Sequence, residues 1–71
     1  MMTRYALLYE RLNTMTMERE TVVAHYADPY GRAERHEYIQ APRQDAEQTM
    51  IAKGWQYRNT PGPQSILMQH A

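Results

Sequence analysis

The scarcity of strong core-forming side chains constrains this chain more than any other sequence feature. Its 71 residues contain two Val, three Ile, four Leu and no Phe. The fraction of the chain made up by Val, Ile, Leu and Phe is below the roughly 20% at which disorder becomes a concern in chains of high net charge. Here, however, eight Lys and Arg residues balance eight Asp and Glu residues. Six Tyr, six Met and one Trp add apolar area. We therefore expect a single folded domain over residues 1–71 with a thin core, which a partner or a second copy would help to stabilise.

The composition also excludes several classes of protein. Without cysteine, the chain forms neither a disulfide scaffold nor a Cys-ligated zinc or iron–sulfur site. The balanced charge disfavours a polyanion binder that relies on bulk charge. No apolar run is long enough to span a bilayer or to serve as a secretory signal. We expect a cytoplasmic protein with no membrane partner.

The strongest local signal is a turn. Asp28, Pro29 and Gly31 occupy the positions that favour a type I turn, and a left-handed Gly31 would close a three-residue hairpin loop with a G1 bulge. The residues suit one strand over 14–27 and a second over 33–40. The register that follows pairs Val22 with Tyr38, Ala24 with His36 and Tyr26 with Glu34.

The segment before this hairpin is compatible with two structures. Tyr5, Leu8, Tyr9 and Leu12 recur at the spacing of an amphipathic helix, which is the interpretation we favour. The alternation of Tyr5, Leu7 and Tyr9 fits a strand instead. Both periods are present, so the alternative stays open.

The second half of the chain predicts a helix followed by two strands. Pro42 suits the first helical turn and Gly54 suits the C-cap, with Ala46, Met50 and Lys53 along one side and Ile51 beside them. Strands are expected over 55–58 and 65–69, separated by a loop rich in Pro and Gly over 59–64.

These elements together predict an α+β fold. The expected order is α-β-β-α-β-β, with a strand as the alternative for the first element. We expect a small antiparallel sheet of about four strands, with one or two helices packed on one face.

No residue pattern indicates catalysis or a metal site. In the preferred register His25 and His36 lie on opposite faces; a two-residue loop would place them opposite each other, as a zinc-binding or pH-responsive pair requires. Ser65 is the only serine and has no nucleophile elbow, and the three glycines form no phosphate-binding loop. We expect no catalytic residue, no cofactor and no metal, and therefore not an enzyme.

Surface residues favour binding instead. We expect Trp55, Tyr38, Tyr57 and Tyr26 mainly in the core and Tyr30 exposed at the turn. Arg and Tyr are enriched at protein interfaces. The predicted partner-binding residues are Tyr30 as anchor, with Arg32, Arg35 and Arg58.

The predicted function is a small non-enzymatic protein-interaction module, as an inhibitor or a homodimer. In size, absence of cysteine and absence of catalytic signatures, the chain is similar to small accessory proteins of phages and plasmids, some of which inhibit a host machine by steric occlusion. The alternative is single-stranded nucleic-acid binding, with tyrosines on a sheet face stacking on bases and arginines contacting phosphates.

Overall fold

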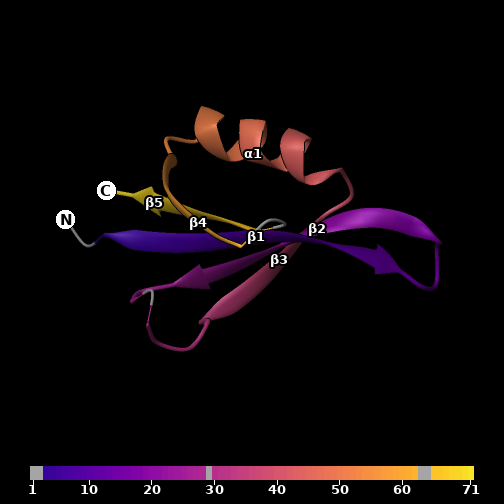
Figure 1. The fold of residues 1–71 in the computed structure, drawn as a ribbon, viewed down its shortest axis with the longest axis horizontal. Helices are drawn as coiled ribbons and strands as arrows, with labels where there is room; N and C mark the ends of the chain where they lie inside the picture. Colours follow the sequence, from indigo (N-terminus) through magenta and orange to yellow (C-terminus); the bar gives the residue numbers. More distant parts are fainter. Residues whose placement is uncertain (1–2, 29, 63–64) are drawn as a thin grey trace.

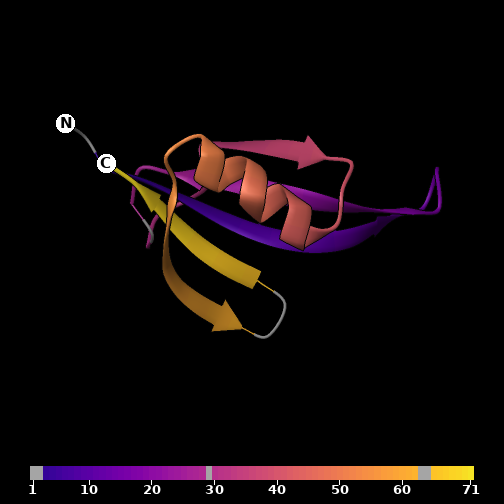
Figure 2. The same cartoon turned by 90° about the horizontal axis from the view of Figure 1, so that it is seen from above.

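The protein folds as one antiparallel sheet with a helix on one of its faces (Figures 1 and 2). The structure, a computed structural model, describes residues 3–28, 30–62 and 65–71, with the backbone alone for 59–62. The sheet has five strands in the order β3-β2-β1-β5-β4. The elements are β1 (Arg4–Asn13), β2 (Glu18–Tyr26), β3 (Arg35–Ile39), α1 (Arg43–Ala52), β4 (Gln56–Gly62) and β5 (Ser65–His70). The α+β class is thus as expected, with five strands instead of about four and with one helix.

The first element is the central strand, so the preference for a helix over residues 4–12 was wrong. β1 pairs with β2 from Tyr5↔Tyr26 to Asn13↔Glu18 and with β5 from Arg4↔His70 to Tyr9↔Ser65. Hydrogen bonds to a neighbour on each side satisfy its backbone, which outweighs the helical spacing of its apolar residues. The strand alternative is confirmed.

The β1–β2 turn shortens the strand predicted over 14–27. Asn13 Oδ1 accepts a hydrogen bond from the Met15 amide at 2.9 Å, and the Met17 amide donates to the Asn13 carbonyl at 2.7 Å. Met17 has a positive φ of 59°. The second strand therefore begins only at Glu18.

The register between β2 and β3 confirms the sequence prediction, whereas the loop does not. Val22 pairs with Tyr38 and Ala24 pairs with His36, but the ladder ends at His25↔Arg35 and does not include the predicted pair of Tyr26 with Glu34. The Gly31 amide donates to the Asp28 carbonyl at 3.0 Å, the hydrogen bond of a β-turn, but Gly31 does not have the positive φ of a G1 bulge. The connection runs from 27 to 34, longer than the three residues predicted. Pro29 lies outside the described residues.

Helix α1 packs against the sheet with Ala46, Glu47 and Met50 buried. Pro42 occupies the N-cap, one residue before the helix, and Gly54 follows its end with a φ of 97°. Lys53, predicted on the same side of the helix as Ala46 and Met50, is exposed and forms the C-cap. The core under α1 consists of Ala6, Leu8, Val23, Ala46, Met50, Trp55 and Met68.

The last two strands form the other half of the sheet. β4 extends through residues 59–62, where a loop was predicted, and two register irregularities against β5 accommodate the Pro and Gly residues of this segment. Residues 63–64 of the predicted loop lie outside the described residues. Within the described part of the chain, no helix has the length and apolar character needed to cross a bilayer.

Candidate functional site

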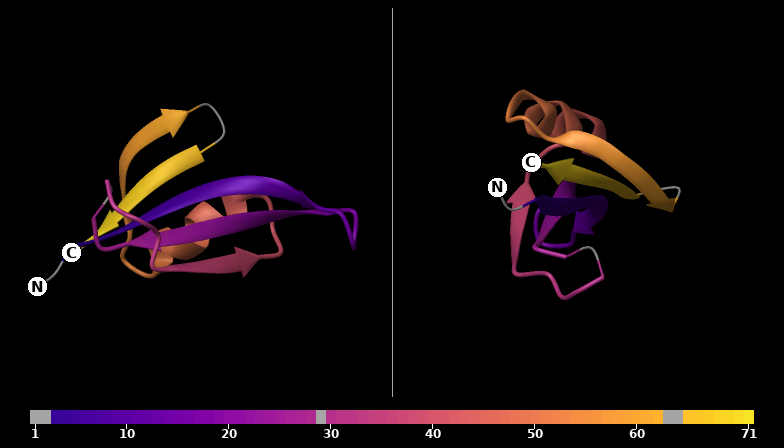
Figure 3. Two further views of the ribbon diagram at one scale, coloured as in Figure 1. Left: turned by 90° about the horizontal axis from the view of Figure 1, so that it is seen from below. Right: turned by 90° about the vertical axis from the view of Figure 1, so that its left-hand side faces the viewer.

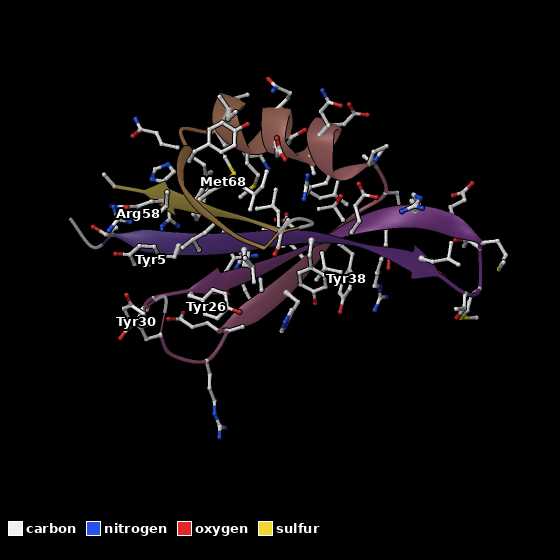
Figure 4. All side chains as sticks on the ribbon, viewed as in Figure 1. Tyr5, Tyr26, Tyr30, Tyr38, Arg58 and Met68 are labelled. Carbon is white, nitrogen blue, oxygen red and sulfur yellow. The ribbon has the colours of Figure 1, made fainter. Side chains whose placement is uncertain are left out.

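Within the described part of the chain, no second layer of helices or strands covers the face of the sheet opposite α1 (Figure 3, left). Strand alternation puts Ala6 and Leu8 under the helix, so Tyr5, Leu7 and Tyr9 project to the other side. Figure 4 shows Tyr5, Tyr26 and Tyr38 on this side and Met68 between sheet and helix. We call this surface the open face. It comprises Tyr5, Leu7, Tyr9, Arg11, Glu20, Val22, Ala24, Tyr26, His36, Tyr38 and Leu67.

Tyrosine rings cover the smaller apolar side chains of the open face. Val22 pairs with Tyr9 on one side and with Tyr38 on the other, and it is only 1% exposed. Tyr5 and Tyr26 form a second cross-strand pair at the other end of this face. Tyr38 itself is 54% exposed. The face is therefore apolar at its centre and bordered by rings whose hydroxyl groups remain able to reach water.

A charged pair fixes one end of the open face. Arg11 Nε donates to Glu20 Oε1 at 2.5 Å, and the Arg11 guanidinium carbon lies 4.9 Å from the centroid of the Tyr38 ring. The hydrogen bond to Glu20 raises the pKa of Arg11. Glu20 is buried, so the bond satisfies a carboxylate that has lost most of its water. Arg11 thereby lies over the Tyr38 ring, and Glu20 neutralises its charge.

The exposure of the aromatic side chains agrees only in part with the sequence prediction. Trp55 is buried as expected, and Tyr30 is 96% exposed as expected. Tyr38 and Tyr57 are more than half exposed, so their assignment to the core was wrong. Tyr38 points away from the single helix, and Tyr57 lies on edge strand β4, where its hydroxyl donates to Glu47 at 3.0 Å.

The structure does not gather the four predicted partner-binding residues onto one surface. Tyr30 and Arg32 lie in the β2–β3 connection, which leads into Arg35 at the start of β3. Arg58 lies on β4, and β3 and β4 are opposite edges of the sheet. Arg35 pairs with His25, which places it on the helix side. Sequence reasoning missed Leu67 and the pairing of Tyr5 with Tyr26, although the alternation of Tyr5, Leu7 and Tyr9 indicated such a face.

Charges separate between the two ends of the sheet. Around the start of β1, the β2–β3 connection and the segment after α1, five cations outnumber three carboxylates. At the other end three cations, all ion-paired, face five carboxylates. We call these the basic end and the acidic end. The cations and carboxylates of the basic end are Arg4, Arg32, Arg35, Lys53, Arg58, Asp28, Glu34 and Glu37; those of the acidic end are Arg11, Arg19, Arg43, Glu10, Glu18, Glu20, Asp45 and Glu47.

Two histidines border Trp55 at the basic end. The ring centroids of His25 and His70 lie 5.8 Å and 5.2 Å from that of Trp55, both in edge-on orientation. Burial lowers the pKa of His25, although its contact with Glu37 at 3.4 Å opposes the shift. His36 projects to the open face, so His25 and His36 are on opposite faces as predicted. Among the described residues, no three His, Asp or Glu side chains form a metal-binding group.

Comparison of the chain with protein-family models, with curated proteins and with solved structures gives no match.

Proposed function

We propose that this protein is a non-enzymatic protein-interaction module that binds through its open face, and that the partner is a second copy of the same chain. The observation that carries the proposal is the tyrosine-bordered face with Leu7, Val22 and Leu67 at its centre, over which the described residues place no second layer. Two copies packed through this face would bury Tyr and Arg side chains, the types enriched at interfaces. A symmetric dimer uses the same patch on both copies.

The separation of charge along the sheet, rather than contact between charged side chains, favours a second copy as the partner, because Arg4, Arg35 and Lys53 lie on the helix side. The whole chain has no formal net charge, yet the basic end has two excess cations and the acidic end two excess carboxylates. A two-fold axis that lies between the sheets and crosses their strands would place the basic end of each copy over the acidic end of the other. A two-fold axis parallel to the strands would instead place like ends of the two copies together, and their charges would repel.

The thin core supports the same partner. The buried hydrophobic side chains are few and several are small, such as Ala6, Ala24 and Ala46. Domains of this size are marginal because they bury only about 60% of their unfolded surface. A second sheet over the open face would supply the missing layer.

Sedimentation velocity over a wide range of micromolar concentrations tests the proposal. The wild type is expected to dimerise, and Leu67→Lys is expected to remain monomeric because it places a charge at the centre of the open face. Ile51→Lys, on the exposed side of α1, is the matched control and should dimerise like the wild type. Circular dichroism checks that each variant is folded, and Tyr38→Lys, at a half-exposed position, replaces Leu67→Lys if that variant unfolds.

A monomeric wild type at every concentration would refute the dimer. A different protein that binds the wild type but not Leu67→Lys would replace the second copy as the partner. That result would agree instead with an accessory or inhibitor role by surface occlusion.

Single-stranded nucleic-acid binding is the second candidate, because Tyr5, Tyr9, Tyr26 and Tyr38 share one face and rings of this kind stack on bases. It is less well supported, since Arg11 among these rings is already paired with Glu20. The candidate predicts that a fluorescent oligothymidylate binds the wild type with an affinity that falls steeply with salt. Salt-independent binding, or none at micromolar protein, would remove it.

A further inference from the structure

The basic end contains a cavity that is separate from the open face. The cavity has a volume of about 210 Å³ and lies on the helix side of the sheet, between the start of β1, β3 and the segment after α1. Arg4, Arg35 and Lys53 contribute cationic side chains to its wall. Its other polar or aromatic lining residues are His25, Glu37, Trp55 and His70.

Trp55 gives this cavity a fixed wall. The side chain is 7% exposed, and the rings of His25 and His70 pack against it edge-on. The guanidinium carbon of Arg4 lies 5.8 Å from its ring centroid. Gly54 holds His70 close, because its φ of 97° suits glycine and a Cβ atom there would lie 3.0 Å from His70 Nε2. That nitrogen also lies 3.1 Å from the Lys53 carbonyl oxygen.

The cavity has an excess of positive charge that the described residues do not neutralise. Arg4, Arg35 and Lys53 form no ion pair within the described part of the chain, and Glu37, the one carboxylate in the lining, contacts His25. Three cationic side chains against one carboxylate leave two excess charges. The acidic end differs, because Arg11, Arg19 and Arg43 each pair with a carboxylate. An unpaired group of cations around a concave site is the arrangement that binds an anion.

We propose that this cavity binds a phosphate group, either as inorganic phosphate or as the monoester of a small organic molecule. Two excess charges match the charge of a phosphate monoester near neutral pH. The planar guanidinium groups of Arg4 and Arg35 suit bidentate contacts to phosphate oxygens. The volume is below the roughly 300–1,000 Å³ of pockets for larger ligands. A neighbouring hollow of about 250 Å³ shares Arg4, His25 and Arg35 and is also lined by Glu34, so it would accommodate the uncharged organic part of a monoester rather than a second phosphate.

The single Trp lies in the wall of the cavity, so its fluorescence serves as the probe. Wild-type protein is titrated at constant ionic strength with inorganic phosphate and, separately, with glycerol 3-phosphate, and calorimetry on the same samples detects binding that leaves the fluorescence unchanged. We expect saturable binding. Arg35→Gln should weaken it by about tenfold, the loss typical of one charge-assisted contact. Arg19→Gln, an exposed arginine at the acidic end, is the matched control and should bind like the wild type.

Tighter binding of inorganic phosphate would identify the free ion as the ligand, and tighter binding of glycerol 3-phosphate would identify a monoester. Absence of saturable binding by both methods, or an unchanged affinity in folded Arg35→Gln, would overturn the proposal. The same titration of Leu67→Lys separates it from the dimer. A monomeric variant that still binds phosphate keeps the cavity independent of the open face.

Discussion

The two faces of the sheet are built from alternate residues of the same strands, yet their chemistry differs. Under α1, Ala6, Leu8, Val23 and Met68 are fully buried and aliphatic or thioether in character. On the open face, the corresponding positions carry Tyr5, Tyr9, Tyr26 and Tyr38 around Leu7, Val22, Ala24 and Leu67. On the face under α1, which we call the covered face, the helix buries the apolar side chains. On the open face, the tyrosine rings bury them.

This difference shows how a chain without phenylalanine covers a sheet with one helix. A tyrosine ring buries its neighbours while its hydroxyl group remains hydrated, so Val22 loses its contact with water even though no helix covers it. Arg11 covers apolar surface in a similar way, because its side chain lies over the Tyr38 ring. Because tyrosine rings replace a second layer, a large amphipathic surface remains exposed, and this is the surface we propose as the interface.

The largest effect expected from the difference between the two faces is on stability, when each of two adjacent leucines is replaced in turn. Leu8→Ala should lower the free energy of unfolding by about 2–5 kcal/mol, because it leaves a cavity under the helix. Leu7→Ala removes the same atoms from the half-buried open face and should cost clearly less. Urea titration followed by circular dichroism measures both, and equal losses would contradict the difference between the faces.

Two arginine variants would separate the ion pairs of the acidic end. Arg11→Gln should lower the melting temperature by several degrees, because it leaves the buried Glu20 without its partner and uncovers Tyr38. Arg19→Gln breaks the exposed pair with Glu10 at 3.2 Å and should leave the melting temperature nearly unchanged. If both variants melt alike in thermal scans, Arg11 has no special role in the open face.

Acidification should weaken the covered face through His25. Its folded-state pKa lies below the ordinary value of about 6.5 because burial disfavours the charged ring. The unfolded chain therefore binds more protons as the pH falls through that value, and the free energy of unfolding should decline as the pH is lowered from about 7 to 5. His25→Gln should flatten the decline measured by urea titration, and His36→Gln on the open face should keep it.

Tyr30→Ala should have the smallest effect on stability. The side chain is 96% exposed in the β2–β3 connection, so the melting temperature should shift by no more than about a few degrees. If Tyr30 also anchors a partner, the variant binds that partner more weakly than the wild type does. A large loss of stability would show that Tyr30 packs into the fold, and it would exclude the anchor role.

Local signals of different strength explain which parts of the fold could be predicted. The turn around Asp28 and Gly31 is local, so the pairing of Val22 with Tyr38 followed from the sequence even though the loop is longer than expected. The segment over 59–62 contains Pro and Gly, which favour a loop, but pairing with β5 makes it a strand with irregularities. Propensity is a weak guide at positions where a neighbouring strand supplies hydrogen bonds.

The candidate sites depend on contacts that link distant parts of the chain. Arg4, Arg35 and Lys53 line one cavity, and no sequence motif connects them. Strand order decides their proximity, because β1 lies beside β2 and β2 beside β3. Arg58 was grouped with Arg35 from composition, and the same strand order separates them.

The sequence by itself determined the α+β class, the β2–β3 register, the helix between Pro42 and Gly54 and the burial of Trp55, because each depends on short-range periodicity, turn chemistry or side-chain type. Only the tertiary structure decided that residues 4–13 form a strand and that Tyr38 faces outward. The apolar residues of the first segment fit both a helical and a strand period, and hydrogen bonding to β2 and β5 selected the strand. Successive side chains of a strand point to opposite faces of the sheet. The helix covers only one of these faces, so Leu8 is buried under it while Tyr9 projects from the open face.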